Sequence, residues 1–394
     1  MLFRLARVND DDCRAYAGLP ARPRAPGEER MSRWPAPPDA PEPVSRARRG
    51  TGRSVLGDVA RRAGVSTATV SRVFNEPGKV SAEVQARVHE AARALNWIPN
   101  AAGRALASTR THIVGAIIPT LDNHVFASQV AGMQAVMAAH GFTLLLGCSN
   151  YDPSQALTQV RAMLARGVEA VSVVGEAQPP ELFELLENQG VPYVVTYAYR
   201  DASPRCCIGF DNRAAFGQLT SHLLELGHRD FAIIMQPSAN NDRVEARLAG
   251  IQRSLAERGI AVRPSHRREG PATLRFGRES LRAIWQAPEP RPSAVICGND
   301  NLALGALLEA EALGIRVPAE LSITGFDDIE LAREIRPALT TMWVDTRAIG
   351  ERAASALLDM LGGQTAVPGF AVAAELRVRE STGPCRRASS AIDS

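Results

Sequence analysis

The stretch LGDVARRAGVSTATVSRVFN, residues 56–75, decides how the front of this chain folds. Its first half repeats apolar residues at helical spacing, which predicts a helix with one buried face: Leu56, Val59, Ala60 and Ala63. Gly64 ends that helix, because glycine accepts the positive φ of a C-terminal cap. Ser66 is a good N-cap for a second helix, in which Val70, Val73 and Phe74 face inward. Two helices joined by a tight turn predict a helix-turn-helix.

The face of the second helix that is not needed for packing carries short side chains, which let a helix approach base edges closely. These residues are Thr67, Ala68, Thr69, Ser71 and Arg72. Ala68 can contact only an apolar feature such as a thymine methyl, whereas Arg72 can bridge O6 and N7 of guanine. Ser66, Ser71 and Asn75 suit phosphate contacts. A three-helix bundle that binds no DNA is the alternative interpretation.

A third helix is predicted from about Ser81, another good N-cap, to Leu95, which completes a compact headpiece at residues 54–99.

Charge supports a nucleic-acid partner for the front of the chain only. Residues 1–53 and 54–110 each carry a net charge of +4, whereas the remaining 284 residues carry −5. A basic front on an acidic body favours a polyanion at that front.

Residues 1–53 are rich in proline and arginine and poor in large apolar residues, so we expect a disordered tail. Met31 is an alternative start, which would leave residues 1–30 untranslated. The arginines at the end of the segment 1–53 offer a second interpretation of this segment, as an arm that scans DNA.

From Ile113 onward, short apolar runs alternate with amphipathic helices. A first series has runs at 113–118, 142–147, 170–175 and 193–197, and a second has runs at 206–210, 231–235, 293–298 and 321–326. Unbroken apolar strands that alternate with helices predict parallel sheets covered on both faces. Two such series predict two doubly wound subdomains with a ligand cleft at the carboxyl ends of their strands.

The front of the chain resembles the headpiece of the LacI/GalR family of bacterial transcription regulators. The matching features are D-V-A-x-x-A-G-V-S-x-x-T-V-S-R-x-x-N from Asp58, then V-S, then I-P-N at residues 98–100. The resemblance implies an all-α helix-turn-helix headpiece and an α/β periplasmic-binding-protein-like core of two doubly wound parallel-sheet subdomains. It places the core at 112–382, with an N-subdomain at about 112–209 and 342–370, a C-subdomain at about 210–341 and 371–382, and a disordered tail at 383–394.

Residues 100–111 resemble the family's hinge helix and linker, which forms on operator binding. The resemblance assigns DNA contacts to Asn100 and to Leu106, a residue suited to wedging a base step in the minor groove. Gly103 departs from the family pattern and weakens this helix, since glycine costs roughly 1 kcal/mol relative to alanine. The alternative for Leu106 is a buried contact between domains.

The same resemblance assigns effector contacts to five residues of the core. They are Asn123, Phe126, Arg247, Asn299 and Asp327. Asn123 suits a hydrogen bond to a polyol, Phe126 can stack on a sugar face, and the fork of Arg247 suits vicinal hydroxyls or a carboxylate. Each has a structural alternative: helix caps for Asn123, Asn299 and Asp327, core packing for Phe126, and an ion pair for Arg247. The turn at residues 209–212 is a further strand end.

The effector class is inferred from two local features. Relatives that bind sugar rings or purines often carry an aromatic residue near Ala272, and none is present here. Arg243 adds positive charge beside Arg247. With PTLDNHVF at 119–126, these features resemble the gluconate-repressor branch and favour an open-chain sugar acid.

We therefore expect a repressor that binds a palindromic DNA operator as a homodimer under the control of a sugar or sugar acid. No catalytic motif, metal site or cofactor is predicted, because no G-x-S-x-G, H-E-x-x-H or phosphate-loop pattern occurs. No apolar run approaches the about 20 residues of a membrane span, so we expect a cytoplasmic protein, on the nucleoid when operator-bound. The alternatives are a regulator that ignores ligands, one that needs a corepressor, an enzyme and a secreted solute-binding protein.

Overall fold

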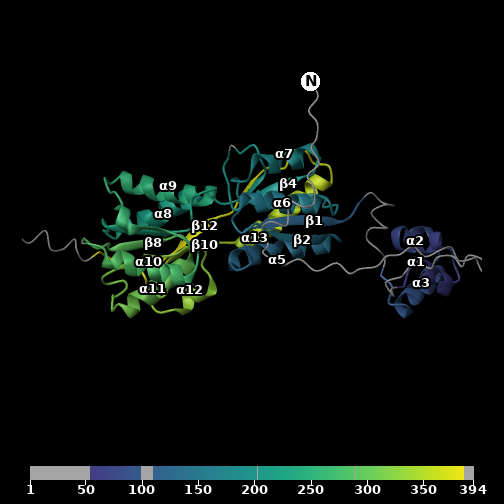
Figure 1. Ribbon diagram of the computed structural model, residues 1–394, viewed down its shortest axis with the longest axis horizontal. Coiled ribbons are helices and arrows are strands. Elements are labelled where there is room, and N and C mark those ends of the chain that lie inside the picture. The colour runs from purple at the N-terminus through teal and green to yellow at the C-terminus, as the bar shows by residue number, and fades with distance from the viewer. Residues whose placement is uncertain (1–53, 99–109, 202, 289, 386–394) are drawn as a thin grey trace, which may run out of the picture. The chain divides into compact units, whose positions relative to one another are not determined.

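The computed structural model describes residues 54–98, 110–201, 203–288 and 290–385 (Figure 1). These residues form two units, one ending at Trp97 and one beginning at Ile98. Asn100, Leu106 and the predicted tail at 1–53 lie outside the described residues.

The first unit is a three-helix headpiece: α1 (Leu56–Ala63), α2 (Thr67–Asn75) and α3 (Ala82–Ala94). Gly64 ends α1 in the left-handed conformation, at φ 66°. Ser66 caps α2 by accepting a hydrogen bond from the backbone N–H of Thr69 at 3.1 Å. Ser81 has the extended backbone of an N-cap, but its side chain makes no capping bond. Instead Gln85, within α3, donates its amide N–H to the carbonyls that precede the helix.

The headpiece core is small and apolar. Its fully buried centre consists of Val59, Val70, Val73 and Val88. Phe74 closes the edge of this core, where its ring meets those of His89 at 5.1 Å and Trp97 at 5.4 Å. Packing therefore uses one face of α2 and leaves its opposite face exposed.

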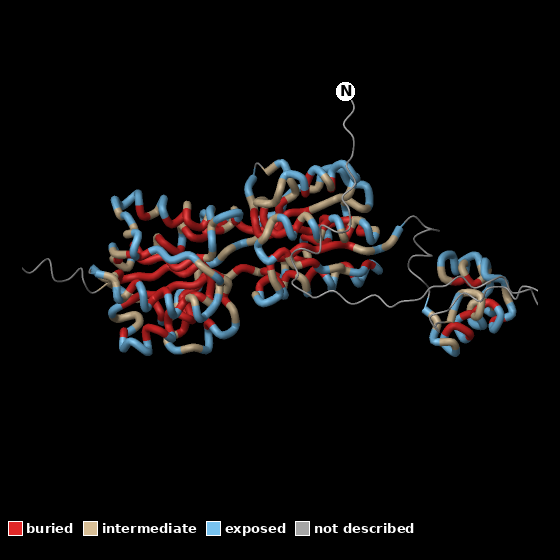
Figure 2. The backbone as a smooth tube through the Cα atoms, in the orientation of Figure 1, coloured by how far each residue is buried: buried red, intermediate tan, exposed pale blue. Residues whose placement is uncertain are grey.

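The second unit contains two parallel sheets. The first has the strand order β11-β5-β4-β3-β1-β2 and the second the order β7-β6-β8-β9. The strands of the first are β1 (Ile113–Ile118), β2 (Thr143–Cys148), β3 (Ala170–Val174), β4 (Tyr193–Thr196), β5 (Cys207–Gly209) and β11 (Phe370–Ala371). Those of the second are β6 (Phe231–Met235), β7 (Arg267–Glu269), β8 (Ala294–Cys297) and β9 (Ser322–Thr324). Figure 2 shows that buried residues run through the interior of both sheets.

Helices cover both sheets. Those that follow strands of the first sheet are α5 (His124–Ala139), α6 (Pro153–Leu164) and α7 (Pro180–Asn188), joined by α13 (Thr346–Leu361). The second subdomain has α8 (Asn212–Glu225), α9 (Asp242–Ala256), α10 (Leu274–Gln286), α11 (Asp300–Ala312) and α12 (Glu330–Glu334). Two one-turn 3-10 helices are η1 (Pro77–Lys79) in the headpiece and η2 (Pro264–His266) before β7. Helix α13 packs tightly on α5 through a glycine on each helix. A Cβ atom at Gly132 or Gly350 would collide with the backbone of the other helix, so only glycine permits this close approach. That contact fixes the start of α5, which reaches the cleft.

The structure decides where the fifth apolar run belongs. The run at 206–210 opens the second series in the sequence, whereas the expected N-subdomain at about 112–209 includes it; β5 pairs in parallel with β4 and so belongs to the first sheet, in agreement with the subdomain bounds. Four short strands, β7, β11 and the antiparallel pair β10 (Thr341–Val344) and β12 (Ala374–Arg377), are absent from the predicted series. Three of them, β7, β11 and β12, carry no run of buried apolar residues, which is the signal on which strand prediction depends.

The subdomain boundaries also differ in detail from those expected. The first sheet extends to Ala371, and β10 and β12 form a ribbon of their own rather than joining either sheet. Residues 383–385, predicted to open the tail, are bound to the second subdomain. Gly383 N–H donates to Ser322 Oγ at 3.1 Å, and Cys385 N–H donates to the Leu226 carbonyl at 2.8 Å.

Gly57→Ala should stabilise the headpiece by about 0.5 kcal/mol, because alanine is the better helix former. Gly57 lies in α1, and an added Cβ would meet nothing within 4 Å. Hydrogen exchange of headpiece peptides in the full chain, followed against urea, measures the change.

Gly64→Ala is the matched control for this prediction. It also has open space around a new Cβ, but its φ of +66° should make the substitution destabilising by about 1 kcal/mol. Equal effects of the two substitutions would contradict the assigned helix end.

Candidate functional site

The outer face of α2 is available to a partner. Thr67, Ala68 and Arg72 are exposed. The Arg72 charge helps to lower the pKa of Glu76, one helical turn further on, but no salt bridge holds the guanidinium among the described residues. Such a guanidinium on an exposed helix can reach a base edge. Three of the side chains predicted to read bases are therefore exposed on one helix.

The hydroxyl and amide groups at the two ends of α2 are already oriented. At the N-terminus Ser66 Oγ lies 2.9 Å from Thr69 Oγ1, and in the last turn Asn75 Nδ2 donates to Ser71 Oγ at 3.1 Å. These bonds are local, so they hold each group in place while Ser66 and Asn75 stay exposed. Such groups at a helix surface suit phosphate oxygens.

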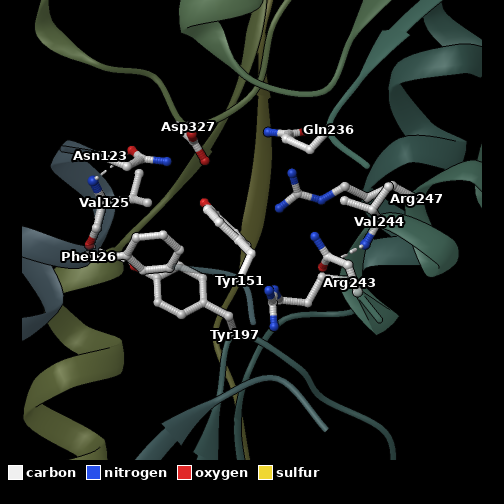
Figure 3. A pocket seen from close by; sticks show the side chains of 11 residues that line it. Asn123, Val125, Phe126, Tyr151, Tyr197, Gln236, Arg243, Val244, Arg247 and Asp327 are labelled. Carbon is white, nitrogen blue, oxygen red and sulfur yellow. Dashed lines mark hydrogen bonds between the residues drawn. The ribbon is translucent and has the colours of Figure 1, made fainter. Parts of the chain in front are cut away.

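The second site is a cavity of about 40 Å³ between the two subdomains of the core. Its lining comes from both subdomains: Asn123, Val125, Phe126, Tyr151, Tyr197, Gln236, Asn241, Arg243, Val244, Arg247 and Asp327. Figure 3 shows Asn123 and Phe126 on one side, Arg243 and Arg247 on the other, and the Tyr151 ring between them. The structure thus brings together four of the five predicted effector residues.

Asn123 and Phe126 line the cavity while also serving the fold. Asn123 caps α5 by accepting the N–H of Val125 at 3.3 Å. Phe126 is buried with its ring edge-on to Tyr197, at 5.1 Å between centroids. The Tyr197 hydroxyl donates to the Val125 carbonyl at 2.6 Å, which locks this wall of the cavity.

Arg247 is held in place by contacts that no local sequence pattern indicates. Its Nε donates to Asn212 Oδ1 and its Nη1 to the Gly298 carbonyl, each at 2.8 Å. The guanidinium carbon lies 4.4 Å from the centre of the Phe326 ring. Burial lowers the pKa of Arg247 to about 10, so it remains a cation at neutral pH. No partner for its Nη2 occurs among the described residues, and Figure 3 shows the guanidinium directed into the cavity.

Asp327 faces the two arginines from the turn after β9. Its backbone φ is 114°, a conformation that favours glycine, and its N–H donates to the Met342 carbonyl at 2.9 Å. Burial raises the pKa of Asp327 to about 7, although Arg247 acts in the opposite direction. The carboxyl can therefore accept or donate a hydrogen bond near neutral pH.

Asn299 is the exception among the predicted effector residues. Its side-chain oxygen accepts the N–H of Leu302 at 3.1 Å and so caps α11, and the residue does not line the cavity. Asn299 is buried within the second subdomain. The helix-cap alternative describes its position here, because the cap turns the side chain toward its own helix.

Sequence reasoning missed several lining residues, above all Tyr151 and Gln236. Gln236 directly follows β6, so the rule that ligands bind at strand ends could have found it. Its Oε1 is buried with no donor among the described residues, and so can accept from a ligand. Tyr151 has a φ of 59°, is 46% exposed and stands three residues after β2. No local pattern indicates that its ring crosses the cleft.

Two sequence families match this chain. Residues 55–100 match the family described as "Bacterial regulatory proteins, lacI family", and residues 220–382 match the "Periplasmic binding protein-like domain". The chain is 31% identical to the HTH-type transcriptional repressor CytR of Escherichia coli (strain K12), over 84% of this chain and 96% of CytR. It is 32% identical to the HTH-type transcriptional regulator GntR of Pseudomonas aeruginosa, over 85% of this chain and 97% of that protein.

Solved structures agree with these matches. A LacI-family regulator from Silicibacter pomeroyi superposes with a TM-score of 0.77 at 26% identity, covering 84% of this chain and 99% of that one. The lac repressor dimer bound to operator and the anti-inducer ONPF gives a TM-score of 0.74 at 28% identity, with the same coverage.

A helix-turn-helix headpiece joined to a two-subdomain α/β core with a cleft defines a DNA-binding transcriptional regulator, not an enzyme. The chain belongs to the LacI family of bacterial regulatory proteins. None of the helices in the described ranges is long and apolar enough to cross a bilayer.

Asp327→Asn should remove part of the pH dependence of stability. The pKa of Asp327 rises from an ordinary 3.8 to about 7 in the folded protein. Ionisation therefore destabilises the folded state as the pH rises between these two values, and the loss is complete above the folded pKa. Asparagine stays neutral, so the variant should gain stability over the parent protein across this window and hold the gain above it.

Urea unfolding at several pH values measures this difference. Burial raises the pKa of Asp300 as well, and the Asp327 carboxylate adds to that rise, so Asp327→Asn should also lower the pKa of Asp300 and strengthen the expected gain. A constant difference between the two proteins from acid to neutral pH would contradict the assigned burial of Asp327.

Proposed function

We propose that this regulator is a repressor that binds a palindromic operator as a homodimer and responds to a sugar acid in the cleft. One observation carries the effector class: Arg243 and Arg247 face Asp327 across a cavity lined by amide groups. Two cations and one carboxyl leave a net positive site, which suits a monoanion that carries hydroxyls. The carboxylate of such a ligand would meet the arginines, and its hydroxyls would meet Asn123, Gln236 and Asp327.

On DNA, the dimer would place two copies of α2 in successive major grooves, about one helical turn apart. Thr67, Ala68, Thr69, Ser71 and Arg72 would face the bases, with Ser66, Asn75 and Asn100 at the backbone. Leu106 of each copy would wedge the minor groove between the half-sites. We place the protein in the cytoplasm, and on the nucleoid when it is bound to its operator.

The effector acts only through a difference in affinity between two states of the core. The cavity of about 40 Å³ has room for roughly three water molecules. A six-carbon acid is larger than this, so we expect the subdomains to separate or rotate when it binds. That movement is the step that would alter the spacing of the two headpieces.

Fluorescence anisotropy of labelled DNA tests this function. The DNA comes from upstream of the regulator's own gene and its neighbours, at two salt concentrations, with and without gluconate and related acids. We expect tight binding that weakens with salt, because phosphate contacts release counterions, and that gluconate relieves. Binding that no acid changes would leave a regulator without this effector, and binding tightened by an acid would indicate a corepressor.

Arg247→Ala should reduce the response to gluconate by about tenfold or more, because a buried charged hydrogen-bond donor to the ligand is lost. Arg253→Ala is the matched control, since Arg253 lies on the same helix but is exposed and pairs with Glu257 at 3.1 Å. Thermal unfolding of both variants checks that the core remains folded. A normal response in a folded Arg247→Ala variant would remove this residue from the site.

Leu106→Gly should weaken specific operator binding by about tenfold or more, since it removes an apolar wedge. Leu106→Met, which retains an apolar side chain, should bind close to the parent protein. Effector binding, measured by isothermal titration without DNA, should be the same in all three proteins. Unchanged operator affinity in Leu106→Gly would refute the wedge.

A further inference from the structure

The two subdomains meet through a contact beside the cavity that the effector site does not need. Asp242 begins α9 in the second subdomain, and its Oδ2 accepts the backbone N–H of Glu176 at 3.0 Å. Glu176 follows β3 of the first subdomain. The bond therefore links the two subdomains directly, between residues that are far apart in the sequence.

The turn that donates this bond is rigidly held. The Glu176 carboxylate accepts from Arg200 Nε at 2.9 Å and Nη2 at 3.0 Å, and also from Ser203 Oγ at 3.0 Å. Gly175 N–H donates to the Thr196 carbonyl at 2.9 Å. The backbone around the Glu176 amide is thus held in place within the first subdomain. The hydrogen bond to Asp242 is not needed to order it.

A glycine at position 175 is required for the close approach. Gly175 has a φ of +79°, and a Cβ atom there would collide with the Arg243 guanidinium and lie 2.6 Å from Asp242 Oδ1. The Arg243 side chain therefore lies against bare backbone of the other subdomain. Its ion pair with Asp242 is long, 3.5 Å, so this pair alone does not fix the guanidinium.

Arg243 also belongs to the effector cavity, which makes the contact relevant to ligand capture. It lines that cavity together with Tyr151, and both residues also line a smaller neighbouring cavity, which is likewise lined from both subdomains. A side chain shared in this way can serve the contact between subdomains or an anion in the cleft. The contact of Arg243 with the first subdomain and its binding of an anion in the cleft are therefore coupled.

We propose that Gly175, Glu176, Asp242 and Arg243 form a clasp that holds the cleft closed, so that an effector enters only after the clasp opens. An anion in the cleft would then draw Arg243 away from Gly175. The closing role of the clasp stands on the contacts alone. Its effect on effector capture rests on the proposed function.

Hydrogen exchange of the full-length protein without effector, read by mass spectrometry, tests the closing role. Asp242→Ala and Gly175→Ala should each increase exchange about fivefold or more at the Glu176 amide and in the segment 236–241, whose Gln236 and Asn241 line the cavity. Asp242→Asn keeps an acceptor oxygen and should stay close to the parent protein.

Two matched controls separate the clasp from general damage. Glu245→Ala removes the other acid of the first turn of α9, which is exposed and makes no contact with the first subdomain in the described ranges. Gly190→Ala introduces a side chain at a φ of +63° with open space around it. Both should leave exchange at Glu176 and at 236–241 unchanged.

Unchanged exchange in Asp242→Ala would overturn the clasp, and faster exchange at Glu176 without any change at 236–241 would overturn its closing role. In stopped-flow measurements, both clasp variants should bind and release gluconate several-fold faster than the parent protein. Rates equal to those of the parent would refute the coupling to effector capture. If gluconate does not bind the parent protein, the proposed effector class fails, whereas the exchange data still decide the closing role.

Discussion

A buried cation organises the core of this regulator. The Arg247 guanidinium lies over the rings of Phe216 and Phe326, and it donates to Asn212 and to the Gly298 carbonyl. A charge this deep is tolerated because hydrogen bonds from Nε and Nη1 and the aromatic rings on its faces compensate for the loss of water. The start of α8, the end of β8 and the turn after β9 must therefore converge on one point. That convergence is the floor of the cleft.

The same point connects the two subdomains through aromatic packing. Phe326 stacks on Phe210 at 5.5 Å, and the edge of the Tyr197 ring faces Phe210 at 6.5 Å and Phe126 at 5.1 Å. This column runs from the second subdomain into the cavity wall of the first. Motion of one subdomain against the other must therefore rearrange packed rings beside the ligand site, so ligand occupancy and subdomain angle are not independent. The cation and the column together explain how a small cleft can control the whole core.

Local sequence patterns predicted almost all of the secondary structure of the headpiece. The bounds of α1 and α2, the cap at Ser66 and the left-handed Gly64 all depend on residues within one helical turn of each other. The strands β1, β3, β6 and β8 could also be predicted from their apolar runs. A strand that is buried on both faces does not alternate between polar and apolar residues. The family resemblance named Asn123, Arg247 and Asp327, and all three line one cavity. Asn299 does not line it, and a helix N-cap and a ligand contact can use the same residue type at the same strand end.

The sequence by itself determined the two kinds of unit, the family and the residues that can carry charge into the cleft. These follow from periodicity, caps and motifs, which depend on short-range geometry. Only the tertiary structure decided that β11 joins the first sheet beside β5, that Tyr151 crosses the cleft, and that Gly175 meets Arg243. Each of these depends on which strand ends the sheet order brings together across a long stretch of chain. Such pairings are set by the packing of whole subdomains, and no window of neighbouring residues contains them.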